Sequence, residues 1–403
     1  MQYFFILGNH PKLSLAEILN VVPRLRIVAF EDAFCIAETN DDASGIDIAS
    51  LQNRLGGTIK IGDVMEEMLP NDFQTLHAKI LSFIDTNTQE KLSLGLSIYN
   101  PHSRWYHKLA RTQREFGMHI KREIKDHGTR VRVVWGKEPD LSSVIVGKNK
   151  LTSENGYEFV FLCRADTVTL GRTRSVQDFS DYSKKDYGRP SRDDRSGMLP
   201  PKLAKIMINL TGTSPASSTI LDPFCGSGTV LSEAALMDYT RIIGNDISTT
   251  AIQATRENLE WLSRMTGKKY FEKKQVELME QDVKNLASAI GQNSIDAIVT
   301  EPFLGPPLTG KESAQDIANI VGKLEKIYAY SIKTFSKILR VHGRCVIVIP
   351  EFHHNKTLNI KTILSGSDLY TRDLSVQGID LSKLIYARPG QKIQRKIHVL
   401  EKR

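Results

Sequence analysis

The chain has 403 residues, of which 40% are hydrophobic and 25% charged, with a formal net charge of +8 and a sequence pI near 9.1. This length exceeds the usual size of one domain, so we expect two, and the composition excludes a largely disordered chain. The excess of positive charge favours a polyanionic partner without defining one.

Neither the cysteines nor the first residues carry a signal for secretion or membrane insertion. The four cysteines lie far apart without CxxC spacing, which fits a reducing compartment. The apolar run 3–7 is too short for a signal-peptide core, and no stretch approaches the length of a membrane span. The histidines are scattered and none lies at ligand spacing. The sequence therefore predicts a cytoplasmic protein that binds neither a membrane nor a metal.

Residues 1–170 show short strands alternating with helices, so we expect an α/β region here. Apolar side chains alternate along Leu92–Tyr99 and along 130–135, as in strands, and the segment 105–125 between them carries one apolar helical face. A further strand is expected over 4–7, with helices over 15–22 and 76–84.

Positive charge is concentrated within residues 101–150. This stretch holds twelve Lys or Arg against five Asp or Glu, a surplus of seven that nearly equals the +8 of the whole chain. Trp105, Tyr106, His102 and His107 are interleaved with the charge, as is typical of nucleic-acid binding. A solvated basic helix face would give the same composition, so both interpretations stay open.

Residues 171–200 are polar and rich in turn-forming residues, which predicts a linker. From 201 to 403, apolar strands end in loops and are followed by helices, the alternation of a parallel sheet wound with helices. Strands are predicted at 219–221, 242–244, Ile295–Thr300 and 344–349, and the segments 383–387 and 392–400 are expected to form a closing antiparallel hairpin.

The sharpest signal is the stretch 221–229, with the sequence LDPFCGSGT, which lies between a strand and a helix expected over 230–237. Gly226 and Gly228 let the backbone pass close to a ligand, and the carboxylate of Asp222 suits the ammonium end of an amino-acid-like cofactor. The sequence contains neither the GxGxxG pattern of dinucleotide-binding proteins nor a P-loop lysine. The sequence therefore gives little support to a protein that binds a nicotinamide cofactor or a nucleoside triphosphate.

Two more carboxylates follow at successive loops. Asp246 ends the next strand, where a carboxylate can accept two ribose hydroxyls. Asp282 suits an adenine amino group, with Ile247 and Val283 placed to sandwich the ring, although Asp282 alone is explained equally well as a helix N-cap. Together with Asp222, these residues describe one nucleoside-sized ligand.

The motifs at 222–229, 245–246 and 197–204 resemble those of the THUMP-associated tRNA guanine-N2 methyltransferases of archaea and eukaryotes, which methylate guanosine 10 of tRNA. The resemblance extends from about residue 185 to the end. It implies a Rossmann-like seven-strand domain that binds S-adenosylmethionine, with the segment before the glycine turn covering its methionine part. The cofactor residues implied by the glycine turn are Asp222, Phe224, Gly226 and Gly228.

The amino-terminal half resembles the same enzymes more weakly, at 6–18 and at 143–150. The resemblance implies an α/β THUMP-like region that docks tRNA, although a plain α/β scaffold would also account for these residues.

The family's fourth-strand motif, Asp-Pro-Pro-Tyr, corresponds in position to EPFLG at 301–305. Glu301 is longer than aspartate by one methylene, Phe303 replaces the second proline and Leu304 replaces the aromatic residue. Because of these changes, the resemblance leaves open whether the loop is catalytic and which base it accepts.

The chemistry of amino methylation explains why acceptors belong at this position. An exocyclic amino nitrogen is a poor nucleophile because its lone pair is delocalised into the ring, and acceptors of its N–H bonds localise that pair. We expect Glu301 and the carbonyl of Pro302 to be these acceptors and Phe303 to stack on an extruded base. The loop 305–310 is expected to cover the base pocket.

The sequence thus predicts three regions: an RNA-docking region at 1–170, a linker and cofactor-covering segment at 171–200, and a methyltransferase domain at 201–403. The predicted activity is methylation of an exocyclic amino group in structured RNA, foremost guanine N2 in tRNA. The alternatives are a DNA adenine amino methyltransferase and an RNA-binding protein that keeps the fold without catalysis.

Overall fold

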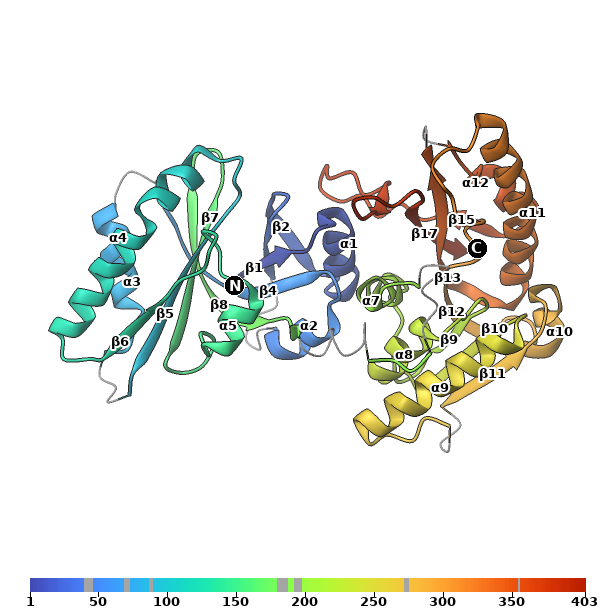
Figure 1. Ribbon diagram of the computed structural model, residues 1–403, viewed down its shortest axis with the longest axis horizontal. Coiled ribbons are helices and arrows are strands. Elements are labelled where there is room, and N and C mark those ends of the chain that lie inside the picture. The colour runs from blue at the N-terminus through green and yellow to red at the C-terminus, as the bar shows by residue number, and fades with distance from the viewer. Residues whose placement is uncertain are drawn as a thin grey trace. The chain divides into compact units, whose positions relative to one another are not determined.

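The computed structural model describes residues 1–39, 46–68, 73–86, 90–179, 188–191, 198–271, 275–353 and 356–403. The chain divides into two compact units, the first formed by Met1–Leu15 and Val22–Asp181 and the second by Ala16–Val21 and Tyr182–Arg403. Each unit combines one sheet with helices (Figure 1). Among the described residues, no helix has both the length and the apolar character needed to cross a bilayer.

The first unit is built on an eight-stranded mixed sheet in the order β2-β3-β1-β4-β8-β7-β5-β6. In it, β5 runs parallel to β6 and β7, and the other neighbours are antiparallel. Its strands are β1 (Gln2–Leu7), β2 (Leu25–Phe30), β3 (Phe34–Thr39), β4 (Thr58–Met68), β5 (Leu92–Tyr99), β6 (Val131–Val134), β7 (Gly156–Cys163) and β8 (Val168–Val176). Its helices are α2 (Ile48–Arg54), α3 (Phe73–Ser82), α4 (Arg104–Asp126) and α5 (Ser143–Lys148), and α1 (Pro11–Val21) begins in it.

The long helix α4 is amphipathic, as its sequence predicts. Trp105, Leu109, Ile120 and Ile124 are buried in a core with strands β5 and β7, because they recur at helical spacing on one face. The opposite face carries the exposed basic side chains Lys108, Arg111, Arg114, Arg122 and Lys125.

The start of the predicted linker belongs to the first sheet instead. Residues 171–176 are the last part of β8, which pairs with both β4 and β7. The strand was missed because Arg172 and Arg174 alternate with Thr and Ser, so the stretch lacks the apolar run of a buried strand. Much of the remaining segment, at 180–187 and 192–197, lies outside the described residues.

The second unit contains a sheet in the order β11-β10-β9-β12-β13-β17-β15. The first five strands are mutually parallel, and β17 is antiparallel to β13 and β15. Counted from β9, this path has the order 3-2-1-4-5-7-6, so the predicted seven-strand sheet is confirmed. The strands are β9 (Thr219–Asp222), β10 (Arg241–Asp246), β11 (Val276–Glu280), β12 (Ile295–Thr300), β13 (Leu339–Phe352), β15 (Leu369–Thr371) and β17 (Gln394–Lys402).

Two short strands lie off this path: β14 (Lys356–Thr357) pairs with β13, and β16 (Leu384–Tyr386) pairs with β17. The antiparallel pairing of β16 with β17 confirms the predicted closing hairpin. The sequence analysis did not find β15, whose three residues are too few for a periodic pattern.

Helices cover both faces of the second sheet (Figure 1). One group is α7 (Pro201–Leu210), α8 (Thr229–Leu236) and α9 (Thr249–Thr266). The other is α10 (Leu286–Ile290), α11 (Ala314–Ile338) and α12 (Ile360–Leu364), together with the 3-10 turn η1 (Val283–Asn285), packed on the main hydrophobic core. Because β9 to β12 are parallel, their carboxyl ends and the loops after them meet at one edge of the sheet.

The second unit also includes Ala16–Val21, the last turns of α1. The fully buried Glu17 accepts a hydrogen bond of 2.7 Å from the amide of Asn209 at the end of α7. Asn20 donates to the carbonyl of Asn209 and accepts from Arg344 of β13 at 3.0 Å. A segment from near the start of the chain is thus bonded into the sheet-and-helix layers of this unit.

Candidate active site

A cavity of about 1610 Å³ lies at the carboxyl ends of β9, β10, β11 and β12. It is larger than the roughly 300–1,000 Å³ usual for a small-molecule site, so a nucleoside cofactor and a base fit together. Ten of the predicted site residues line it: Asp222, Phe224, Gly226, Asp246, Ile247, Asp282, Val283, Glu301, Pro302 and Phe303.

Different structural constraints favour glycine at the two glycine positions of the turn after β9. Both have positive φ, 53° at Gly226 and 81° at Gly228. A Cβ on Gly226 would meet nothing within 4 Å, so the space beside it is open to a ligand. A Cβ on Gly228 would come within 2.8 Å of Thr255 on α9. The second glycine is therefore explained by packing against α9, and the expectation that it approaches a ligand has no support in the cavity lining.

Asp222 is a buried carboxylate at the end of β9. Its Oδ1 accepts hydrogen bonds from the hydroxyl of Thr300 at 2.8 Å and from the backbone N–H of Phe224 at 3.1 Å. Burial is the main cause that raises the pKa of Asp222 to about 7; these two hydrogen bonds oppose the shift, and the nearby charges of Asp246 and Glu301 add to it. A buried carboxylate of this kind is stabilised when a cationic group enters the cavity.

Asp246 is held in place by two backbone donors at the end of β10. The N–H groups of Gly226 and Ser248 each donate to one carboxylate oxygen at 3.0 Å. Asn245 beside it donates to the carbonyls of Pro223 and Gln281, both at 3.1 Å, and so ties the ends of β9 and β11 to β10. These bonds fix the direction of the Asp246 carboxylate before any ligand arrives.

Ile247 and Val283 flank the region expected for adenine but differ in exposure. Ile247 is 69% exposed and lines the cavity, which is unusual for a large apolar side chain. Val283 is buried in the core beneath the cavity. Asp282 caps η1 by accepting from the N–H of Lys284 at 3.0 Å, so the N-cap interpretation describes its contacts, and its place in the cavity lining allows a ligand contact as well.

Glu301 follows β12 and is bound by Arg395 of β17. Nε and a terminal nitrogen of Arg395 bind the two carboxylate oxygens, the second at 3.1 Å, and the two side chains are only 14% and 6% exposed. Burial raises the pKa of Glu301, while the guanidinium opposes that shift. The sequence analysis missed Arg395, since it lies 94 residues further along the chain. The sequence signal that could have pointed to such a residue is that a carboxylate expected to be buried needs a cationic partner.

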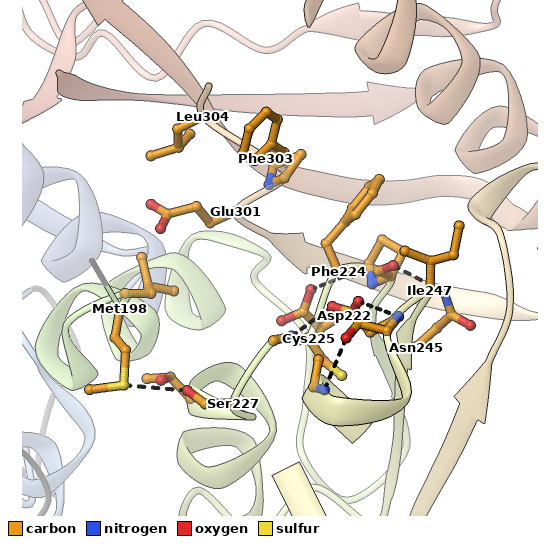
Figure 2. A pocket seen from close by; sticks show the side chains of 18 of the residues that line it. Met198, Asp222, Phe224, Cys225, Ser227, Asn245, Ile247, Glu301, Phe303 and Leu304 are labelled. Atoms are coloured by element: carbon orange, nitrogen blue, oxygen red, sulfur yellow. Dashed lines mark hydrogen bonds between the residues drawn. The ribbon is translucent and has the colours of Figure 1, made fainter. Parts of the chain in front are cut away.

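Phe303 and Leu304 project from the same segment as Glu301, as Figure 2 shows. Phe303 is 57% exposed, so it is a rim residue and not part of the core. Tyr330 of α11, 55% exposed, also lines the cavity and has the amine of Lys284 4.9 Å from its ring centroid. It too was missed, because it lies on a helix distant in sequence from the motifs. Residues 305–308 of the expected covering loop line the cavity as well.

The segment before α7 also lines the cavity. Met198 and Leu199 are part of the lining, and the hydroxyl of Ser227 donates to the sulfur of Met198 at 3.4 Å (Figure 2). Gly197, from the same motif, lies outside the described residues.

The strand order, the glycine turn and the acidic residues after three successive strands define the second unit as a Rossmann-like methyltransferase domain. Residues 189–361 match the family of RMKL-like methyltransferase domains. Residues 70–257 match a DNA methylase family, a range that stops before the Glu301 loop.

Curated relatives confirm the resemblance to tRNA guanine-N2 methyltransferases. The chain is 38% identical over 109 residues to tRNA (guanine(10)-N2)-dimethyltransferase of Methanothermobacter thermautotrophicus, covering 27% of this chain and 28% of that protein. It is 28% identical over 165 residues to U6 snRNA (guanine-N(2))-methyltransferase THUMPD2 of Bos taurus, covering 40% and 26%. The match thus spans less than a third of either relative.

The crystal structure of TrmN from Thermus thermophilus is similar over 100% of both chains, with a TM-score of 0.54 and 15% sequence identity. At this identity the likeness shows the fold alone, and it extends over both units.

Proposed function

We propose that this chain is an S-adenosylmethionine-dependent methyltransferase that modifies the exocyclic N2 amino group of guanine in tRNA. The observation that carries the proposal is the convergence of Asp222, Asp246, Asp282 and Glu301 on one cavity with an exposed Phe303 at its rim. Three of these carboxylates suit one nucleoside cofactor, and the fourth suits an amino group beside it.

The residues present fit S-adenosylmethionine. The raised pKa of the buried Asp222 calls for a cation such as the cofactor's ammonium, and Asp246 is oriented for ribose hydroxyls by Gly226 and Ser248. The open space at Gly226 and the exposed Ile247 leave room for the sugar and the adenine ring. When bound, the cofactor supplies a methyl group on a positively charged sulfur.

The acceptor residues act on the nucleophile. Glu301 and the carbonyl of Pro302 accept hydrogen bonds from the two N–H groups of the guanine amino group. These hydrogen bonds localise the lone pair on the nitrogen. As this nitrogen forms its new bond it becomes acidic, and Glu301 accepts the proton that it loses. Burial raises the pKa of Glu301, so its carboxylate is a stronger base than an exposed glutamate. Phe303 stacks on the base.

The choice of guanine N2 rests on the relatives, whose printed names specify this atom in two different RNAs, tRNA and U6 snRNA. We propose tRNA as the substrate because the motifs of this chain resemble the tRNA enzymes. An adenine amino group in DNA is the enzymatic alternative. The second alternative is an RNA-binding protein without catalytic activity. The ion pair between Glu301 and Arg395 favours this alternative, since the proposed acceptor already has a partner.

Methyl transfer from labelled cofactor to total tRNA and to duplex DNA tests the proposal. We expect incorporation into tRNA, recovered as N2-methylguanosine after nuclease digestion. Label in DNA adenine would support the enzymatic alternative. Binding of tRNA and cofactor without transfer to either nucleic acid would support the non-catalytic one.

We further propose that the first unit docks the RNA through the exposed basic face of α4. Each Lys or Arg that neutralises a phosphate makes binding more sensitive to salt. Reversing the charges of Arg111, Arg114, Lys121 and Arg122 together is expected to flatten the dependence of log Kd on log salt. An unchanged slope and affinity would show that this face is only solvated. The four unpaired, buried cysteines support a reducing compartment, and we place the protein in the cytoplasm.

A further inference from the structure

The helices α3 and α4 of the first unit bring together two histidines and a glutamate. His119 and Glu123 lie one turn apart on α4, and His77 faces them from α3. One potential ligand atom from each side chain lies within 4.8 Å of the others. The sequence predicted no metal, because the third ligand comes from another helix and no motif reveals it.

Glu123 faces the two histidines with one carboxylate oxygen each, at separations longer than hydrogen bonds. Nδ1 of His77 is 3.5 Å from Oε2 of Glu123, and Nε2 of His119 is 3.8 Å from Oε1. Both exceed the range of about 2.7–3.2 Å for hydrogen bonds from nitrogen to oxygen. In a tetrahedral zinc site, with bonds of about 2.0–2.2 Å, the ligand atoms lie about 3.3–3.6 Å from one another.

The side chains can complete this geometry. His77 is 13% exposed and is fixed by edge contacts with the rings of Phe116 and His119, at centroid distances of 5.8 and 4.6 Å. His119 is 52% exposed, so its ring has room to turn and bring the three atoms from within 4.8 Å of one another toward ligand spacing. This open side leaves room for a water as a fourth ligand.

We propose that His77, His119 and Glu123 bind one zinc ion, which joins α3 to α4. Two imidazoles, one carboxylate and a water form a ligand set typical of zinc. The ion would crosslink two helices that otherwise pack mainly through apolar side chains. This crosslink lies in the first unit, whereas the candidate active site lies in the second. The proposal is therefore independent of methyl transfer.

The test uses the untagged full-length chain after removal of metal with a chelator. Titration with Zn²⁺ by calorimetry is expected to show one equivalent bound, and Co²⁺ in its place is expected to give the visible absorption of a four-coordinate site. Zn²⁺ is also expected to raise the Tm of the chain and to slow amide exchange in α3.

Variants locate the ion. His119→Ala and Glu123→Gln are expected to weaken Zn²⁺ binding by about tenfold or more, since even the loss of an outer partner of a zinc ligand costs 10- to 100-fold. His119 is exposed, so its replacement spares the core. His107→Ala, another exposed histidine of α4, is the matched control and should bind as wild type does. Absence of saturable binding at one equivalent, or equal affinity in His119→Ala and His107→Ala, would overturn the proposal.

Discussion

The two sides of the cavity hold their carboxylates in different ways. On the side proposed to bind the cofactor, Asp246 and Asp282 are oriented by backbone N–H groups within the loops that carry them or an adjacent one. On the acceptor side, Glu301 is oriented by Arg395, a side chain from the hairpin strand β17. The first side is thus formed by local turns at the ends of neighbouring strands. The acceptor side depends on how the end of the chain folds back onto the sheet.

With the proposed roles, this difference predicts that cofactor binding and the chemical step can be altered separately. Changes at Asp222 or Asp246 should alter cofactor affinity, whereas changes at Glu301 or Arg395 should alter the chemical step and leave cofactor affinity nearly unchanged. Four experiments sharpen or break this separation.

The largest effect is expected for Glu301→Gln. The amide cannot accept a proton, so methyl transfer should fall by about 100-fold or more, while the affinity for cofactor persists. Single-turnover methyl transfer and calorimetry measure the two quantities. Glu301→Asp, which shortens the side chain by one methylene, is the companion variant. Wild-type transfer by the Gln variant would show that Glu301 is not the acceptor, and activity gained in Glu301→Asp over an inactive wild type would mark the natural loop as non-catalytic.

On the cofactor side, Asp246→Ala should weaken cofactor binding by about 2 to 4 kcal/mol, because it removes two charge-assisted hydrogen bonds to the ribose. Since Ala also frees the N–H groups of Gly226 and Ser248, Asp246→Asn serves as a control that keeps an acceptor for them. Unchanged affinity in the Ala variant would contradict the placement of the ribose.

Cofactor binding should also depend on pH through Asp222. Its pKa of about 7 lies above the ordinary value of 3.8, so the carboxylate is partly protonated at neutral pH. Binding of an ammonium requires the ionised form, so affinity should rise with pH and fall about tenfold per unit below pH 7. Calorimetry between pH 5.5 and about 7.5, where an α-amino group stays charged, measures this slope. A flat profile, or an equal slope in Asp222→Asn, would rule out Asp222 as the partner.

The smallest effect is expected for Arg395→Gln. Without the guanidinium, the buried Glu301 has a higher pKa, so the acid limb of the kcat profile should move to higher pH, and the loss of rate relative to wild type should be greatest at low pH. Arg395→Lys should recover part of the shift. A uniform loss at every pH, with no rescue by Lys, would mean that Arg395 only supports the fold.

The same contrast explains what the sequence could predict. The strands Leu92–Tyr99 and Ile295–Thr300 were predicted with their observed bounds, because their apolar patterns are long and bounded by turns. The acidic residues after three successive strands could be anticipated because each belongs to a strand-end loop. Arg395 and His77 could not, since their partners lie far away in sequence and only the packed fold brings them together.

The two glycines of the turn after β9 show the same dependence on residues outside the motif. The open space at Gly226 agrees with the expected approach of a ligand, but the contact that requires Gly228 is with Thr255, a residue of another helix. A motif indicates which positions are constrained, and the physical cause of each constraint depends on neighbours that the motif does not contain.

The hydrogen bonds of α1 set an order of events during synthesis. Glu17 is fully buried, and its partner Asn209 emerges from the ribosome 192 residues later. At about 5 to 20 residues per second, the Asn209 amide that donates to Glu17 follows it by roughly 10 to 40 s. The hydrogen bond between α1 and α7 therefore cannot form until about half of the chain has been translated, although the rest of the first unit is complete before then.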